Sequence, residues 1–221
     1  MSHIHLVANE DARHRLLQLG ELAEAIHIIG SPGIDILLSN NLPPLSKVKQ
    51  YYEIPFEYYA IIMFHPVTTE IANWESYTRN FVDAVLASDR NYIAIYPNND
   101  LGSEIIMREF KRFSGNPRIR VFPSLRFEYF LVMLRHAQFV LGNSSAGVRE
   151  ASYYGVSVID IGTRQQSRVS GEHVINVGYG TDEILEAIAS VVDKHRSPHL
   201  WVKVDDELRL RHTVAKEGAD Y

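Results

Sequence analysis

Short apolar runs alternate with longer stretches of helical spacing along most of this 221-residue chain. The runs are rich in β-branched and aromatic residues, and they predict strands at Ile4–Ala8, Ala25–Ile29, Tyr59–Phe64, Tyr92–Tyr96, Ile119–Phe122, Phe139–Leu141 and Val156–Ile161. The longer stretches repeat apolar residues every three or four positions, which predicts helices at Glu70–Ala87, Leu101–Phe113, Arg126–His136 and Asp182–Lys194. This alternation is typical of βαβ units, so we predict an α/β fold with a Rossmann-like parallel sheet.

The two ends of the chain differ from its middle. Near the start, Asn9 is expected to cap a helix that Gly20 ends, and this helix lies between the first two predicted strands. Ser31-Pro32-Gly33 then breaks the pattern, so we separate residues 1–30 from a main domain at 31–195. Residues 196–221 are highly charged, and we expect a polar tail that forms either a marginal helix or a mobile segment.

The composition narrows the classes of partner. The formal net charge is −5 and the chain has no basic run, so a small ligand is favoured over nucleic acid. The absence of cysteine excludes disulfides, thiolate catalysis and Cys-ligated zinc. No apolar run approaches the roughly 20 residues that span a bilayer, and Met1–Asn9 does not resemble a signal peptide. We therefore expect a cytoplasmic protein that does not bind membranes.

Four polar loops follow predicted strands, and in an open parallel sheet ligands bind beyond the carboxyl ends of the strands. Their sequences are HPVTTE (65–70), PNNDLGS (97–103), GNSSAGVRE (142–150) and GTRQQSR (162–168). In the first loop, His65 can donate to a phosphate, and Thr68 or Thr69 is expected to cap the next helix. In the second loop, Asn98 or Asp100 either contacts a ligand or caps the following helix, and capping is the stronger alternative.

The third and fourth loops carry the residues that suit an anion. Gly142–Glu150 brings glycines and hydroxyls to a helix start directly after a buried strand, where free N–H groups favour negative charge. Glu150, in the first turns of that helix, can accept two hydrogen bonds from a ribose diol. The alternative for this loop is an Asn or Ser cap with a surface glutamate. Arg164 can form a forked bond to a phosphate, or it is a solvated surface arginine.

These loops resemble one protein family. The strings HPVTTE, PNNDLGS, GNSSAGVREA and GVSVIDIGTRQQSR, together with HLVANEDARHRLLQLGE and IIGSPGID, are similar to the hydrolysing UDP-N-acetylglucosamine 2-epimerases of sialic-acid and legionaminic-acid synthesis. The resemblance runs from about His5 to Glu186, and the paired serines of GNSS are typical of the hydrolysing branch.

The resemblance implies the C-terminal half of a glycosyltransferase-B-like fold, without most of the N-terminal domain. Residues 1–30 would then be the last elements of that N-terminal domain, 31–195 the UDP-binding Rossmann-like domain, and 196–221 the polar tail. We expect the chain to be truncated relative to a complete enzyme.

The resemblance also implies a set of UDP-binding residues: His65, Asn98, Leu125, Ser144, Ser145, Glu150 and Arg164. In this assignment His65 contacts the diphosphate, as do the two serines at the helix start. Glu150 holds the ribose, and Leu125 meets the uracil through its backbone. Arg164 helps to position the nucleotide, and Asn98 lies near the substrate.

The activity implied is conversion of UDP-N-acetylglucosamine to N-acetylmannosamine and UDP in nonulosonic acid synthesis. UDP leaves after loss of the C2 proton, and water then adds to the resulting glycal. We expect the acid–base carboxylates in the missing N-terminal domain, so the chain would hold no catalytic residue and would be inactive alone. No cofactor or metal is expected, and a homo-oligomer is compatible with the family. The alternatives are a non-catalytic UDP-sugar-binding subunit, a UDP-diacetylbacillosamine 2-epimerase and a glycosyltransferase-like half.

Overall fold

The computed structural model describes residues 3–30, 32–37, 41–165 and 173–194. The chain divides into two compact units, Met1–Leu42 and Pro43–Tyr221. This division lies after the boundary that the sequence predicts at residue 30, and it leaves helix α2 (Pro32–Leu37) in the first unit. The predicted tail at 196–221 lies outside the described residues.

The first unit is a small βαβ element. Strand β1 (His5–Val7), helix α1 (Glu10–Gln18) and strand β2 (Ile26–Ile28) follow one another, with a 3₁₀ turn η1 (Ala23–Ala25) before β2, and the two strands pair in parallel. Asn9 caps α1 as predicted, because its Oδ1 accepts the Ala12 N–H at 2.9 Å. Several large apolar side chains of this unit are exposed: Ile4, Leu6, Leu19 and Leu22.

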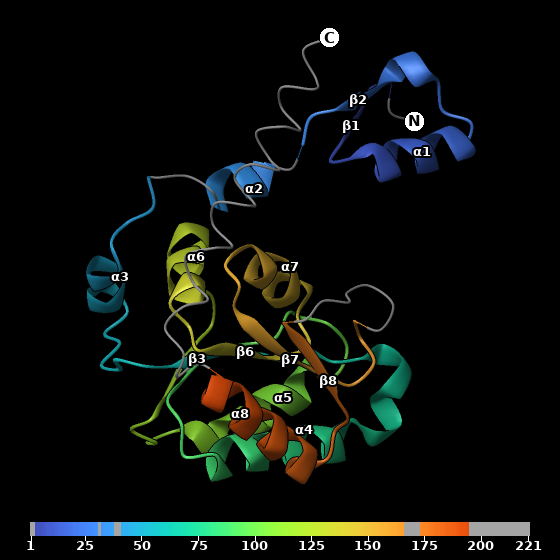
Figure 1. The fold of residues 1–221 in the computed structure, drawn as a ribbon. Helices are drawn as coiled ribbons and strands as arrows, with labels where there is room; N and C mark the ends of the chain where they lie inside the picture. The colour runs from blue at the N-terminus through green and yellow to red at the C-terminus, as the bar shows by residue number, and fades with distance from the viewer. Residues whose placement is uncertain (1–2, 31, 38–40, 166–172, 195–221) are drawn as a thin grey trace. The chain divides into compact units, whose positions relative to one another are not determined.

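The second unit is built on a six-stranded parallel sheet (Figure 1). The strands in chain order are β3 (Ala60–Met63), β4 (Tyr92–Ile95), β5 (Ile119–Phe122), β6 (Phe139–Gly142), β7 (Ser157–Ile161) and β8 (Val174–Val177). Their spatial order is β5-β4-β3-β6-β7-β8, which is the doubly wound order of a Rossmann fold. The predicted α/β class and parallel sheet are therefore confirmed. Strand β8 was not predicted, because this edge strand is short and half-exposed and so has a weak apolar signal.

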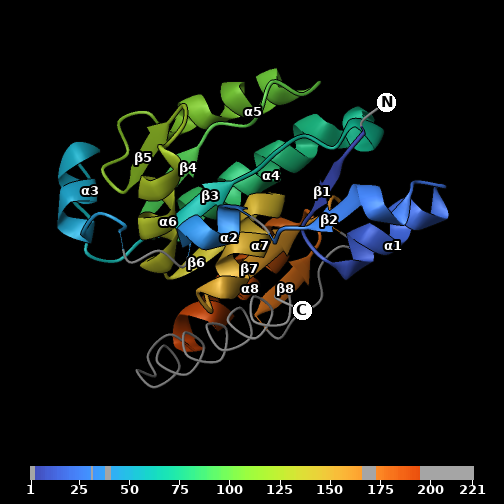
Figure 2. The same ribbon diagram turned by 90° about the horizontal axis from the view of Figure 1, so that it is seen from above.

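Helices cover both faces of this sheet (Figures 1 and 2). They are α3 (Leu45–Tyr51), α4 (Trp74–Ala87), α5 (Ser103–Phe110), α6 (Phe127–Arg135), α7 (Ser145–Tyr153) and α8 (Thr181–Lys194), with 3₁₀ turns η2 (Thr68–Asn73) and η3 (Lys111–Phe113). Helices α4, α5 and α8 lie on one face, and α6 and α7 lie on the other. The four predicted helices of this unit are present, whereas α3 was missed because it is short and buries only Val48.

A stack of buried aromatic rings lies where α4 packs against the sheet. Phe64, directly after β3, stacks on Trp74 at 5.2 Å and on Phe81 at 4.3 Å between ring centroids. All three side chains are fully buried. Buried aromatic pairs of this kind add about 0.5–1.5 kcal/mol each beyond the burial of their area. The end of β3, from which the first predicted ligand loop leaves, is therefore anchored in the buried core of the unit.

Candidate functional site

The candidate site lies where β3 and β6 are neighbours. From these two central strands the sheet continues outward in opposite directions, and such a switch point opens a crevice at the carboxyl ends of the strands. Met63 of β3 pairs with Gly142 of β6. The φ of Gly142 is +142°, and a Cβ there would lie 2.1 Å from the Met63 carbonyl oxygen. Only glycine allows the two strands to approach so closely at this point.

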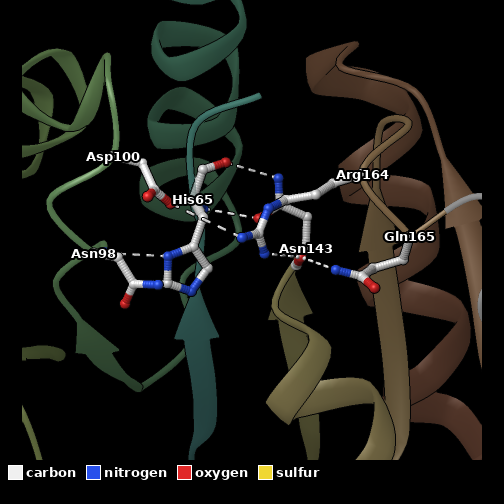
Figure 3. Close-up of polar contacts among 6 residues, drawn as sticks. All are labelled: His65, Asn98, Asp100, Asn143, Arg164 and Gln165. Atoms are coloured by element: carbon white, nitrogen blue, oxygen red, sulfur yellow. Dashed lines mark hydrogen bonds and ion pairs between the residues drawn. The ribbon is translucent and has the colours of Figure 1, made fainter. Parts of the chain in front are cut away.

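Asn143 joins the loops that follow these strands (Figure 3). Its Nδ2 donates to the His65 carbonyl oxygen at 2.8 Å, and its Oδ1 accepts the His65 N–H at 2.8 Å. The Asn143 side chain is fully buried, so these amide bonds are sheltered from water. The reciprocal pair fixes the backbone that carries the His65 ring.

The His65 ring is arranged as a neutral donor. It is 6% exposed, and its Nδ1 accepts the backbone N–H of Asn98 at 3.3 Å. Burial, and then the nearby Arg164 charge, lower the pKa of His65 to about 4, while the Asp100 carboxylate opposes this shift. With Nδ1 acting as an acceptor, the proton of the neutral ring is on Nε2. At neutral pH the ring can therefore donate one hydrogen bond through Nε2–H.

Arg164 brings a positive charge to the same place. Its Nη1 donates to the Asn143 carbonyl oxygen at 3.1 Å, and Gln165 Nε2 donates to that oxygen at 2.9 Å. The other end of the guanidinium, Nη2, lies 4.0 Å from Asp100 Oδ2, and the side chain is 26% exposed. A guanidinium that is held at one end and partly open to solvent can still bind an oxyanion.

The remaining predicted residues belong to neighbouring elements. Ser144 is buried at the N-cap of α7, and Ser145 is the exposed first residue of that helix. Glu150 is half-buried further along α7. Leu125, also half-buried, lies between β5 and α6, and β5 is separated from β3 by β4. The contacts of Figure 3 thus unite His65, Asn98 and Arg164, but not Leu125 or Glu150.

Two capping predictions are wrong. Helix α4 has Asn73 at its N-cap, and the predicted caps Thr68 and Thr69 belong to the 3₁₀ turn η2. Helix α5 begins after Gly102, whose φ of +94° turns the chain, so neither Asn98 nor Asp100 caps it. The predictions assumed that each helix begins directly after the polar residues of its loop. Instead, each loop makes an extra turn before its helix starts.

Sequence reasoning missed the central role of Asn143. The residue was considered only as a helix cap, although Ser144 occupies that position and makes no side-chain capping bond. A usable signal was present, because Asn143 follows a glycine at the end of a fully buried strand. Gln165 was also missed as an anchor. Three residues of the same predicted loop, Gln166, Ser167 and Arg168, lie outside the described residues.

A buried carboxyl group lies in β7. Asp160 is 1% exposed, pairs in register with Gly142, and its Oδ1 has no hydrogen-bond partner. Burial raises the pKa of Asp160 to about 6. Within the described ranges, no three acidic or histidine side chains gather as a metal site would require, and no helix has the length and apolarity to cross a membrane.

Comparison with known proteins gives one family. The family described as UDP-N-acetylglucosamine 2-epimerase matches residues 1–205. The chain is 53% identical to the UDP-N-acetylglucosamine 2-epimerase of Neisseria meningitidis over 188 residues, covering 85% of this chain and 50% of that protein. It is 29% identical to the hydrolysing UDP-N,N'-diacetylbacillosamine 2-epimerase of Legionella pneumophila, over 88% of this chain and 52% of that protein. The chain thus spans about half the length of these curated relatives.

Solved structures agree on the fold. The UDP-GlcNAc 2-epimerase of Methanocaldococcus jannaschii has a TM-score of 0.63 at 18% identity, over 97% of this chain and 62% of that one. An epimerase from Listeria monocytogenes has a TM-score of 0.60 at 16% identity, over 87% of this chain and 52% of that one. The fold is that of about half of a glycosyltransferase-B-like protein, as predicted. The chain therefore belongs to the UDP-N-acetylglucosamine 2-epimerase family.

Proposed function

We propose that this chain is the UDP-binding half of a hydrolysing UDP-N-acetylglucosamine 2-epimerase. The complete enzyme would convert UDP-N-acetylglucosamine to N-acetylmannosamine and UDP. The observation that carries the proposal is that a neutral hydrogen-bond donor, His65, and a partly exposed cation, Arg164, both lie at the switch point of the sheet. A diphosphate needs both hydrogen-bond donors and positive charge, and this edge of the sheet offers both through protein side chains.

The nucleotide would lie across the carboxyl ends of the central strands. In this proposal His65 Nε2–H and Arg164 contact the diphosphate, while Ser144 and Ser145 contribute at the positive end of α7. Glu150 would hold the ribose hydroxyls further along the same helix. Through its backbone, the loop at Leu125 would meet the uracil, and Asn98 would lie towards the sugar.

The acid–base chemistry belongs to groups outside this chain. Removal of the C2 proton needs a base within hydrogen-bond reach, and we assign that role to carboxylates of an N-terminal domain. Two observations support such a domain. The chain spans about half of its curated relatives, and the first unit exposes apolar side chains that a further layer would cover. Residues 1–30 would then be the last elements of the N-terminal domain and 31–195 the UDP-binding domain.

The choice of sugar and of branch rests on the relatives. The relative at 53% identity is named for N-acetylglucosamine, whereas those named for diacetylbacillosamine are 29% and 26% identical. The Ser144-Ser145 pair supports the hydrolysing branch. A 33% identical relative in Escherichia coli is named as a polysialic acid biosynthesis protein, which supports a role in sialic-type acid synthesis.

Calorimetry on the 221-residue chain tests the proposal. We expect UDP to bind equally well with and without a chelator, and Arg164→Ala to weaken binding by roughly tenfold or more, as loss of a charge-assisted bond predicts. A matched control is Arg108→Ala, which removes an exposed arginine paired with Glu75 on α4. Absence of UDP binding, or a strict need for a metal, would overturn the proposal.

A turnover assay tests the assignment of the catalytic groups. With UDP-N-acetylglucosamine, the isolated chain should release no measurable UDP or N-acetylmannosamine. Turnover near that of a full-length relative would show that the acid–base groups lie in this chain after all. The same assay with UDP-diacetylbacillosamine, on a full-length protein, separates the two sugars.

A further inference from the structure

We infer that Glu70 is a positioning residue for Arg164. Its carboxylate holds the loop after β7 so that the guanidinium stays at the switch point. The inference rests on the proposed function, because it concerns how the proposed phosphate contact is kept in place. It adds a residue that binds no ligand itself and that acts through Thr163, the neighbour of Arg164 in the chain.

The carboxylate of Glu70 joins two distant segments. Glu70 lies at the kink of η2, where its backbone is not helical (φ −117°, ψ 15°). Its Oε1 accepts the Thr163 hydroxyl at 2.6 Å, and its Oε2 accepts the Tyr179 hydroxyl at 2.5 Å. Hydrogen bonds from hydroxyl groups to a carboxylate are stronger than those to a neutral acceptor. Each carboxylate oxygen thus holds a different loop.

Tyr179 is itself fixed on α4. Its ring stacks on Tyr77 at 3.9 Å and meets Trp74 edge-on at 5.9 Å between centroids. Its carbonyl oxygen accepts the Asn80 side-chain amide at 3.2 Å. Burial, and then the neighbouring Glu70, raise the pKa of Tyr179, so its hydroxyl remains a donor at neutral pH. Glu70 is therefore tied to a rigid ring rather than to a free side chain.

The chain leaving β7 passes directly against this ring. Gly162 has a φ of +77°, and a Cβ at this position would lie 2.1 Å from the Tyr179 ring. The Gly162 N–H also donates to the Val177 carbonyl oxygen at 2.8 Å. Thr163 comes next and reaches Glu70, and Arg164 follows. The described part of the loop is thus held by Glu70 before Arg164, while Arg164 itself reaches Asn143.

This arrangement matters because an arginine side chain has many rotamers. Ordering a long side chain costs up to about 2 kcal/mol of entropy, and a fixed backbone removes part of that cost before a ligand arrives. If the Glu70–Thr163 bond is removed, Arg164 keeps its charge but loses one anchor. The effect should then appear in phosphate binding and should depend on the presence of Arg164.

A double-mutant cycle tests the inference. Thr163→Val removes the hydroxyl at an exposed position with little change of shape, so the fold should persist. We expect it to weaken UDP binding about fivefold in the wild-type background and to have no effect when combined with Arg164→Ala. The effects of two mutations are not additive when the residues act together. Uridine, which has no phosphate, should bind both forms equally. Thr163→Ser keeps the hydroxyl and should restore UDP affinity.

A second measurement is independent of UDP. In ¹⁵N NMR spectra of the ligand-free chain, the Nε–Hε signal of Arg164, identified by its loss in Arg164→Ala, should broaden or shift in Thr163→Val and in Glu70→Ala, which removes the acceptor of the Thr163 hydroxyl. It should not change in Glu75→Ala, a matched control on the surface of α4. An unchanged signal in the first two variants, or equal loss of UDP affinity with and without Arg164, would overturn the inference. Failure of the wild-type chain to bind UDP would instead contradict the proposed function, and the NMR result would still decide the role of Glu70.

Discussion

Replacing Asn143 with alanine tests whether the amide pair holds the site together. The change removes two hydrogen bonds of 2.8 Å each and leaves the N–H and C=O of His65 without their side-chain partner. Both residues are buried, so water cannot readily replace the amide. An unsatisfied buried polar group costs about 1–3 kcal/mol, so two such groups predict a loss of about 2–6 kcal/mol in the free energy of unfolding.

Urea denaturation followed by circular dichroism measures this loss, and a matched variant calibrates it. Asn91 also donates an amide hydrogen bond to a backbone carbonyl, that of Tyr58 at 3.0 Å, but does so at the surface. Asn91→Ala should therefore cost about 1 kcal/mol or less, because water can take the place of the amide. The two variants differ mainly in burial and in the number of backbone groups served.

The same change should also weaken UDP binding, since His65 is carried by the backbone that the amide fixes. Equal stability losses in Asn143→Ala and Asn91→Ala would refute the reasoning, because burial would then have no effect. Unchanged UDP affinity in a folded Asn143→Ala variant would show that the amide pair is not needed to place the His65 ring.

Four further changes have directions that follow from the structure. Gly142→Ala should cost at least about 3 kcal/mol in urea denaturation, because its Cβ would collide with the Met63 carbonyl oxygen at 2.1 Å and the backbone would be strained. Asp160→Asn should stabilise the protein by about 1–3 kcal/mol at pH 8 but hardly at pH 4. The folded pKa of Asp160, about 6, lies above the ordinary 3.8, so the wild-type protein loses stability as the pH rises from 3.8 to 6. A stabilisation that does not vary with pH would contradict this account. The folded pKa of His65, about 4, lies below its ordinary 6.5, so wild-type stability should fall as the pH is lowered from 6.5 to 4. A His65→Asn variant followed over the same pH series should lack this pH-dependent loss of stability. Glu150→Ala should weaken UDP binding by about 1.5–3 kcal/mol in calorimetry and leave the binding of 2′,3′-dideoxyuridine diphosphate unchanged. Equal losses for both nucleotides would show that Glu150 does not bind the ribose hydroxyls.

The periodicity of apolar residues alone determined most of the sheet. Buried strands such as Ala60–Met63 and Phe139–Gly142 are nearly all apolar, and the amphipathic helices between them repeat every three or four residues. Both signals are local, because they come from residues a few positions apart on one element. The polar loops after the strands also identified the family and included His65 and Arg164.

Only the tertiary structure decided which side chains meet. The Asn143–His65 pair joins residues 78 positions apart, and the Glu70–Thr163 bond joins residues 93 positions apart. No local pattern encodes such contacts, because they exist only once β3 and β6 are neighbours and the loop after β7 lies against Tyr179. Strand β8 depends on the sheet in the same way, since its four residues gain their hydrogen bonds from β7. The chemistry of each residue could be read along the chain, whereas its partners came from the packing of distant segments.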